Sequence, residues 1–322
     1  ARERVEALKA LQSARRQRDT LISQLVCQKE DHFPELDLTD VVGNSLKETF
    51  SSLRASNLVS GGFSMERDCT SFKVLSTEGN HIVYEAEFPD GTWRALKFFP
   101  LKTTKSMGTF RRELGLLHRL EHPHIVKLLG VHLVENGTGA YIEMPLYNGG
   151  TLATWLAAEE RSPELLRSII HQLFQAVHHL HAHHVIHSDV HPSNIFITNN
   201  AETRAWVLVL GDFDVSVNLA ERTMYFLDAT KAHVGGHDGY IAPELRPPRN
   251  EKATTAVDMY AMGVILQLMS DKINSANFTS LVQTMLSDSP QLRPTAHAAM
   301  QNPYFLDEQA QVQAKLNEEA AA

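Results

Sequence analysis

Three groups of polar residues follow one another along the chain in a pattern suited to one kind of chemistry. Lys97 follows an apolar run that is typical of a strand. Residues 187–194 (HSDVHPSN) hold Asp189 and Asn194 in one short segment, and Asp212 begins an Asp-Phe-Asp tripeptide. Phosphoryl transfer requires positive charge on the phosphates, oxygen ligands for a divalent cation and a carboxylate that orients the attacking hydroxyl. These residue types, in this order, can supply each requirement.

The elements that would position these residues change in character along the chain. Alternating apolar residues predict strands around Val74, at 82–86 and at 93–99, and the Pro-Asp-Gly turn at 89–91 joins two of them as a hairpin. We expect a helix over 109–120 and further strands over 126–133 and 139–144. After Gly149 the helical period dominates, with long helices predicted over 165–183 and 258–269. The pattern predicts an α+β chain with a small β-rich lobe followed by a larger helical lobe.

The ordered set of motifs resembles the eukaryotic-type protein kinase family. Residues 187–194 resemble the kinase catalytic loop, and residues 212–214 stand where the family has Asp-Phe-Gly. The flanking segments 122–128, 149–152, 239–244, 258–263 and 293–295 resemble further family markers in the family's order. The resemblance covers roughly 230 residues, from about Phe72 to Phe305, which makes chance agreement negligible. It implies a two-lobed protein-kinase-like fold, here with an N-terminal helical extension.

The resemblance also implies roles for particular residues. Asp189 would be the catalytic base, and Glu113 would hold Lys97 in an ion pair. Asn194 and Asp212 would bind magnesium. The implied cofactors are therefore ATP and Mg²⁺. The implied nucleotide-binding residues are Lys97, Glu78, Val83, Ala95, the gatekeeper Met144, Leu146 in the hinge, His191, Asn194 and Asp212. The family fold further pairs Glu244 with Arg293 and uses Asp258 to brace the catalytic loop.

The segment that aligns with the family's glycine-rich loop lacks its three glycines. Ser76, Glu78 and His81 stand at those positions. Glycine lets backbone N–H groups approach phosphates closely, so we expect these side chains to push the loop away and Glu78 to repel a triphosphate. The sequence therefore predicts weak ATP binding that tightens when glycine is restored at the three positions.

Other departures lie in the catalytic and activation segments. Ser188 replaces the arginine that normally clasps a phosphorylated activation loop, so we expect no control of that kind. His191 replaces a lysine that contacts the γ-phosphate in serine/threonine kinases. Asp214 replaces the glycine of Asp-Phe-Gly, and His237 replaces the usual threonine before the Gly-Tyr-x-Ala-Pro-Glu motif. The distance in sequence from Glu244 to Arg293 is also shorter than is usual in the family.

Three functions remain open from the sequence. The favoured hypothesis is a protein kinase that transfers the γ-phosphate of ATP to a protein hydroxyl, with serine/threonine preferred because Gly239 begins the motif form seen in those kinases. The alternative is a pseudokinase scaffold, a binding module that keeps the fold and part of the machinery. A third is a small-molecule kinase of the aminoglycoside or choline type, which shares the two-lobed core and resembles residues 187–194.

Composition limits the partners and the compartment. A formal net charge of -8 argues against a nucleic-acid interface, and no run of about 18 apolar residues predicts a membrane span. Two cysteines, Cys27 and Cys69, predict no disulfide framework and favour a reducing, cytoplasmic compartment. The sequence begins at Ala1 and not at Met, which indicates a piece of a longer protein. The predicted partner is a protein substrate.

We expect five parts along the chain. Residues 1–30 show a helical apolar stripe, which predicts a helical extension. The stripe is compatible with a coiled-coil arm for self-association and with a helix that docks a partner. A linker or docking segment follows at 31–71. The kinase N-lobe and hinge are predicted at 72–148, the C-lobe at 149–306 and a tail at 307–322.

Overall fold

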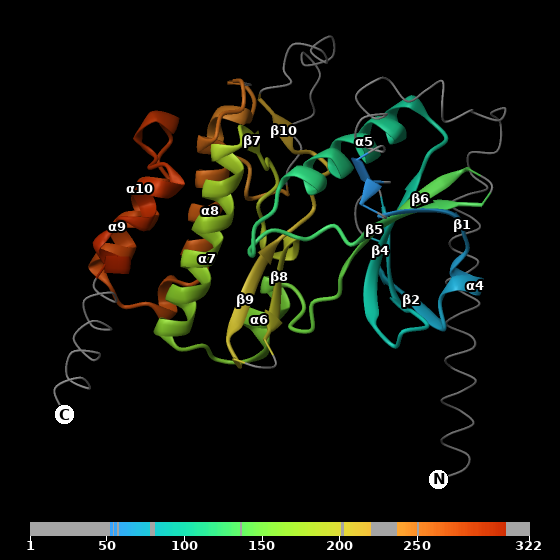
Figure 1. The fold of residues 1–322 in the computed structure, drawn as a ribbon. Helices are drawn as coiled ribbons and strands as arrows, with labels where there is room; N and C mark the ends of the chain where they lie inside the picture. Colours follow the sequence, from blue (N-terminus) through green and yellow to red (C-terminus); the bar gives the residue numbers. More distant parts are fainter. Residues whose placement is uncertain are drawn as a thin grey trace. The chain divides into compact units, whose positions relative to one another are not determined.

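The structure is a computed structural model, and it describes residues 52–53, 55–56, 58–77, 81–135, 137–200, 203–219, 237–249 and 251–306. The chain divides into two compact units (Figure 1). The described part of the first unit runs to Glu121 and includes residues 127–146, and the second contains residues 122–126 and the described residues from Tyr147 onward. The first unit is rich in strands and the second in helices, which confirms the predicted two-lobed α+β fold. The predicted N-terminal helix at 1–30 and the tail at 307–322 lie outside the described residues.

A six-stranded sheet forms the first unit, in the order β1-β5-β6-β4-β3-β2. Its elements are β1 (Val59–Phe63), α4 (Met65–Asp68), β2 (Ser71–Ser76), β3 (Ile82–Glu87), β4 (Trp93–Pro100), α5 (Thr104–Arg119), β5 (Gly130–Val134) and β6 (Gly139–Pro145). Neighbouring strands are antiparallel except β1 and β5, which are parallel. The sequence pattern predicts no strand before Phe72, so β1 is an addition to the expected sheet.

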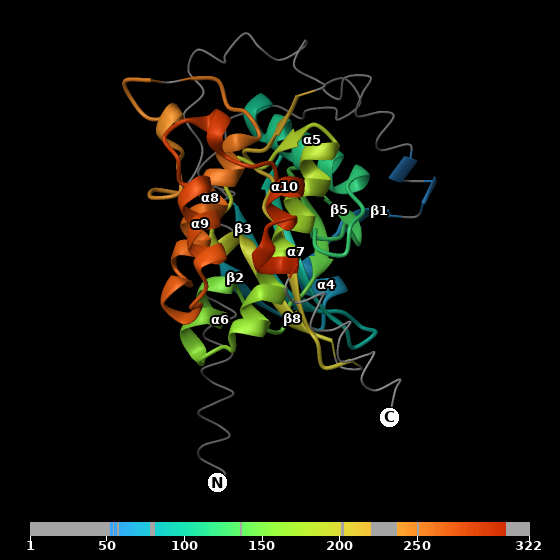
Figure 2. The same cartoon turned by 90° about the vertical axis from the view of Figure 1, so that its left-hand side faces the viewer.

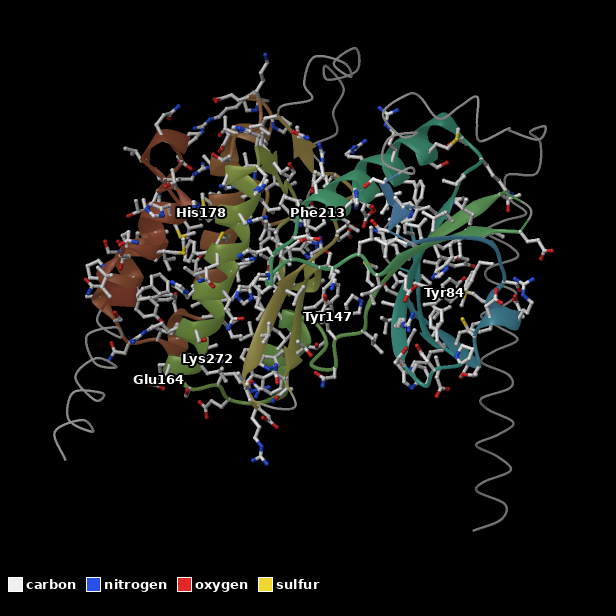
Figure 3. The ribbon with its side chains drawn as sticks, viewed as in Figure 1. Tyr84, Tyr147, Glu164, His178, Phe213 and Lys272 are labelled. Carbon is white, nitrogen blue, oxygen red and sulfur yellow. The ribbon has the colours of Figure 1, made fainter. Side chains whose placement is uncertain are left out.

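The two faces of this sheet carry different layers. Side chains alternate along a strand, so β4 directs Lys97 and Phe99 to one face and Leu96 and Phe98 to the other. On the first face the ring of Phe99 lies 5.3 Å from that of Phe110 on α5, measured between centroids. On the second face Leu96 and Phe98 join a buried cluster that contains Phe63, Met65, Cys69, Ile82, Tyr84 and Ala86 (Tyr84 is labelled in Figure 3). Helix α5 therefore covers one face, and the segment around α4 covers the other.

Helix α5 begins five residues earlier than the predicted start at Thr109. Thr103 forms a capping box with Ser106: the Thr103 side chain accepts from the Ser106 backbone, and the Ser106 side chain accepts from the Thr103 backbone. Two N–H groups that would otherwise lack partners are satisfied in this way, which stabilises a helix start by about 1 kcal/mol. The cap extends the helix through Gly108, a residue that weakens the sequence signal for a helix.

The second unit is built around α7 (Pro163–Ala182). Its start is fixed by Ser162, whose side chain accepts from the Leu165 backbone, and by Pro163 in the first helical position. Its apolar residues Leu166, Ile169, Ile170, Leu173, Phe174, Ala176, Val177 and Leu180 are all buried. The other helices are α6 (Leu152–Ala158), α8 (Ala256–Gln267), α9 (Ala276–Met285) and α10 (Ala296–Met300). Figure 2 shows α9 beside α8 and α10 beside α7.

Short strands and single turns of 3-10 helix lie within the segments that connect the helices of this unit. They are β7 (Val185–Ile186), η1 (Pro192–Asn194), β8 (Ile195–Asn199), β9 (Trp206–Leu210), β10 (Val217–Asn218), η3 (Pro243–Leu245), η4 (Ser270–Lys272) and η5 (Pro290–Leu292). β8 and β9 form an antiparallel pair, and β7 pairs with β10. Residues 122–126 belong here because the Val126 backbone donates to Leu210 and the Leu210 backbone donates to His124. None of the helices in the described part of the chain has the length and apolar character needed to cross a bilayer.

Candidate active site

Lys97 and Glu113 form a buried ion pair in the first unit. Lys97 lies in the middle of β4 and Glu113 in the middle of α5. The Lys97 Nζ lies 3.0 Å from Oε1 and 2.9 Å from Oε2 of Glu113, so the ammonium group donates to both carboxylate oxygens. The side chains are only 6% and 1% exposed. The pairing that the resemblance implied is therefore present.

Three further predicted nucleotide-binding residues lie on the Lys97 face of the sheet. Val83 pairs directly with Lys97 across β3 and β4, and Ala95 pairs with Met144 across β4 and β6. Directly paired residues of antiparallel strands present their side chains to the same face, and Ala95 lies two residues from Lys97. The sheet thus gathers Val83, Ala95, Met144 and Lys97 in one patch. Leu146 follows β6 directly.

The residues that stand in place of the family's three glycines lie in different environments. Ser76 is half-buried at the end of β2, and Glu78 lies outside the described residues. His81 is buried: its ring lies 4.2 Å from the Phe99 ring between centroids, and its Nδ1 lies 3.1 Å from the Phe98 carbonyl oxygen. His81 is therefore a core residue of the first unit.

The catalytic-loop segment of the second unit is fixed by Asp258 of α8. Its Oδ2 accepts from the His187 backbone N–H at 2.9 Å, and its Oδ1 accepts from the Ser188 backbone at 2.8 Å. Asp258 is 1% exposed, and His181 Nε2 lies 2.9 Å from Oδ2. This confirms the expected bracing of the loop by Asp258. Ser188 itself adopts a left-handed backbone conformation with φ of 68°, which is uncommon for a residue other than glycine and which the brace helps to hold.

The Asp189 carboxylate lies among three polar partners. Its Oδ1 accepts from the His237 backbone at 2.9 Å, and its Oδ2 accepts from Asn194 Nδ2 at 3.2 Å and lies 3.6 Å from His191 Nε2. The rings of His191 and His237 are stacked, with centroids 4.6 Å apart and planes inclined by 17°. Burial raises the pKa of Asp189, but the neighbouring His191 and the His237 N–H outweigh it, so the pKa lies below its usual value. Asp189 is thus held as a carboxylate.

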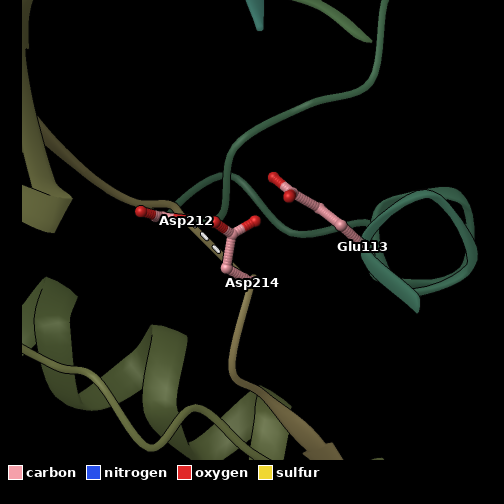
Figure 4. Close-up of side chains that lie close together, drawn as sticks. All are labelled: Glu113, Asp212 and Asp214. Atoms are coloured by element: carbon pink, nitrogen blue, oxygen red, sulfur yellow. Dashed lines mark hydrogen bonds between the residues drawn. The ribbon is translucent and has the colours of Figure 1, made fainter. Parts of the chain in front are cut away.

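Asn194 and the Asp-Phe-Asp segment lie side by side in the second unit. The Gly211 backbone donates to the Asn194 carbonyl at 2.9 Å, and Asp212 follows directly. Asp212 has a φ of 63°, another uncommon conformation of the kind that clusters at functional sites. Figure 4 shows Asp212 and Asp214 on this loop, with the 3.5 Å hydrogen bond from the Asp214 backbone to Asp212 Oδ1; Glu113, also drawn there, belongs to α5 of the first unit.

His187 contacts both the catalytic-loop segment and the Asp-Phe-Asp segment. It is fully buried, its Nε2 lies 3.0 Å from the Gly211 carbonyl oxygen, and its ring lies 5.0 Å from that of Phe213 (labelled in Figure 3). Burial lowers the pKa of His187, against the opposing charges of Asp258, Asp189 and Asp212. A neutral imidazole can donate through Nε2 to the Gly211 carbonyl and accept at Nδ1 from the Asp189 backbone, which lies 3.3 Å away. His187 therefore sets the spacing of Asp189 from the Asp212 segment.

A second buried ion pair stabilises the end of the activation segment. Arg293 donates through Nη1 and Nη2 to the two carboxylate oxygens of Glu244, each at 2.7 Å, and both side chains are at most 2% exposed. Arg293 also donates to the carbonyl groups of Ser287 and Ala256 at 2.9 Å. The pairing implied by the resemblance is confirmed.

Two positioning features were not anticipated from the sequence. The backbone contact of His237 with Asp189 had no sequence signal, because it depends on how the chain returns to the loop. The strand β1 could not be recognised in the sequence because Gly61 and Gly62 within it are typical of a linker. A further sequence signal was available in Phe63 and Met65, apolar residues that follow those glycines.

Comparison with known proteins agrees with this geometry. Residues 82–274 match the family described as protein kinase domain. That match covers more than half of the chain, and the chain belongs to this family.

Curated relatives are protein kinases of several kinds. The chain is 29% identical over 212 residues to a probable leucine-rich repeat receptor-like protein kinase of Arabidopsis thaliana, covering 63% of this chain and 25% of that protein. It is 33% identical over 187 residues to a calcium/calmodulin-dependent protein kinase of Metarhizium anisopliae (57% and 46%). It is 28% identical over 214 residues to the serine/threonine-protein kinase cds1 of Schizosaccharomyces pombe (62% and 44%). The chain thus spans less than half the length of these three relatives.

Proposed function

We propose that this chain is a catalytically active protein kinase that uses ATP and Mg²⁺ and transfers the γ-phosphate to serine or threonine hydroxyls of protein substrates. The observation that carries the proposal is the buried Lys97–Glu113 pair. Burying two charges costs several kcal/mol per ion, and the attraction between them offsets this only in good geometry. A scaffold has no physical requirement for such a pair, whereas a kinase requires an ammonium group at a fixed place to neutralise phosphate charge.

The donor set of the second unit suits magnesium. Mg²⁺ prefers oxygen ligands, and Asp212 offers a carboxylate. Asn194 directs its amide nitrogen to the carbonyl and carboxylate oxygens of Asp189, at 3.1 and 3.2 Å, so its amide oxygen faces away from Asp189. Asn194 and Asp212 would hold the ion, and Mg²⁺, when bound, supplies positive charge that balances the phosphate oxygens.

Asp189 acts on the substrate hydroxyl. Its lowered pKa keeps it ionised at neutral pH, so it can orient the hydroxyl and accept its proton as the oxygen attacks phosphorus. The His237 N–H and Asn194 amide hold the two carboxylate oxygens in place. Lys97, held by Glu113, donates to the phosphates. His191, whose Nε2 lies 3.6 Å from Asp189 Oδ2, stands where serine/threonine kinases have the lysine that contacts the γ-phosphate.

The serine/threonine preference draws on the relatives. The fission-yeast relative is named a serine/threonine-protein kinase, and the present chain carries the Gly239-Tyr240 motif form on which the sequence prediction was based. The buried Glu244–Arg293 pair also favours a protein kinase over a small-molecule kinase, since the latter lacks these two residues.

The test is transfer of labelled γ-phosphate from ATP to protein, followed by identification of the labelled residues. We expect phosphoserine or phosphothreonine from the wild type and a rate at least about a hundredfold lower from Lys97→Met. Phosphotyrosine would contradict the specificity. Labelling of an aminoglycoside or choline but not of protein would favour the small-molecule alternative, and absence of transfer together with absence of ATP binding would favour a scaffold.

A further inference from the structure

The segment before the family match takes part in the first unit. The match begins at residue 82, but β1 extends the sheet at the free edge of β5, with Val59 opposite Val131 and Ser60 opposite His132. The Val131 backbone donates to Leu58 at 2.7 Å. An edge strand without a partner leaves a row of backbone groups unpaired, so this pairing gives β5 hydrogen bonds that it would otherwise lack.

The same segment covers the second face of the sheet. Phe63 and Met65 are 5% and 4% exposed and belong to the cluster that includes Leu96 and Phe98 of β4. The Phe63 ring also stacks on that of His132, with centroids 4.4 Å apart. Strand β4, which carries Lys97, is therefore packed on this face by residues that the family match does not include.

A chain of polar contacts connects β1 to β4. Ser60 Oγ lies 2.6 Å from His132 Nδ1, and His132 Nε2 lies 2.7 Å from Glu143 Oε2. Glu143 is 4% exposed and also accepts from Arg94. Burial raises the pKa of Glu143, but His132 and Arg94 outweigh this and lower the pKa, so the carboxylate stays ionised. Arg94 lies three residues before Lys97 on the same strand.

The segment also contacts α5. Ser52 Oγ lies 3.0 Å from Nε2 of His118, which lies five residues after Glu113 on the helix. Leu53 beside it is fully buried, and the Leu58 backbone donates to the Leu53 carbonyl at 2.9 Å. One continuous segment therefore touches both elements that supply the Lys97–Glu113 pair.

We propose that the described residues between Ser52 and Cys69, which we call the N-terminal brace, position the Lys97–Glu113 pair and so tune phosphate binding. The brace fixes β4 through the second face and α5 through His118, and the ion pair requires these two elements to stay at a fixed separation. Packed side chains and rigid elements of this kind can transmit a displacement of one residue to another that it does not contact. Phe63 and Ser60 are then positioning residues for Lys97. This proposal rests on the proposed function in so far as Lys97 binds phosphate.

The test compares Phe63→Ala with Phe305→Ala in the full chain. Both phenylalanines are 5% exposed, but Phe305 packs on Phe174 in the second unit, so the pair is matched in the size and burial of the lost ring. Hydrogen exchange of the α5 amides and binding of ATP and of adenosine are measured for each. We expect Phe63→Ala to speed α5 exchange about tenfold and to weaken ATP about tenfold more than adenosine, because only ATP carries phosphate. Phe305→Ala should do neither.

Each outcome decides the proposal. Equal α5 exchange in the two variants, or equal weakening of ATP and adenosine by Phe63→Ala, overturns it. If Phe63→Ala does not fold, Ser60→Ala removes the contact to His132 from a surface position and should show the same pattern more weakly; an unchanged ATP-to-adenosine ratio in Ser60→Ala contradicts the proposal. A wild type that binds neither compound would refute the proposed function, and α5 exchange alone would then decide whether the brace holds the helix.

Discussion

Replacing Arg293 by methionine should destabilise the second unit more than any single surface change. The guanidinium makes two 2.7 Å hydrogen bonds to Glu244 and is fully buried. Methionine keeps much of the side-chain volume but leaves the Glu244 carboxylate buried without its partner. Removal of one member of a buried pair costs about 3–5 kcal/mol, a large fraction of the total stability of a typical domain, about 5–15 kcal/mol.

The assay is denaturant or thermal unfolding of three variants beside the wild type. At roughly 2–4 °C per kcal/mol for a unit of this size, Arg293→Met should lower Tm by about 10 °C. Arg293→Lys should lie between, because lysine keeps the charge but loses the paired geometry. The double variant Arg293→Met with Glu244→Leu should regain part of the loss, since no buried charge remains. A loss below about 1 kcal/mol in Arg293→Met would refute the argument that the pair holds this region.

Three further predictions concern binding and stability. Glu113→Gln should weaken ATP binding about tenfold with little effect on adenosine, because it removes the charge that holds Lys97; isothermal titration with both compounds checks this, and equal effects would contradict it. His81→Gly should lower the free energy of unfolding by about 3 kcal/mol, since it removes a buried ring beside Phe99. Denaturant titration measures this loss, and any tightening of ATP binding by the same substitution must be compared with it. Burial lowers the pKa of His122 to about 4, whereas the imidazole of the unfolded chain takes up its proton near pH 6.5. The free energy of unfolding should therefore decline as the pH falls from about 6.5 to 4. A His122→Gln variant whose unfolding free energy declines as steeply over this pH range as that of the wild type would contradict the assignment.

The chemistry-bearing pairs were predictable from sequence because each lies in a motif with fixed spacing. Lys97 lies in a predicted strand and Glu113 in a predicted helix, and the structure brings their charged groups to 2.9 Å. The roles of Asp258 and Arg293 followed from the same ordered set. Such residues are recognisable because the required atoms leave few alternative residue types.

The parts that could not be predicted depend on tertiary partners. Gly61 and Gly62 lower the strand signal of β1, which forms because the free edge of β5 supplies hydrogen bonds and Phe63 finds an apolar face. His81 stands at a glycine position of a motif, and only the packing of Phe99 shows that its ring belongs to the core. The early start of α5 depends on a capping box at Thr103, which lies outside the apolar pattern.

Catalysis through Asp189 is the central claim, and one measurement tests it most directly: Mg²⁺-dependent transfer of labelled γ-phosphate from ATP by the wild type and by Asp189→Asn. Asparagine keeps the shape of the side chain and, through its one oxygen, one of the two hydrogen bonds that the carboxylate accepts from His237 and Asn194, but it cannot take the hydroxyl proton. We predict transfer by the wild type and a loss of about a hundredfold or more in Asp189→Asn, with ATP binding retained. Equal transfer by the two proteins, or no transfer by a wild type that binds ATP and Mg²⁺, would contradict the account.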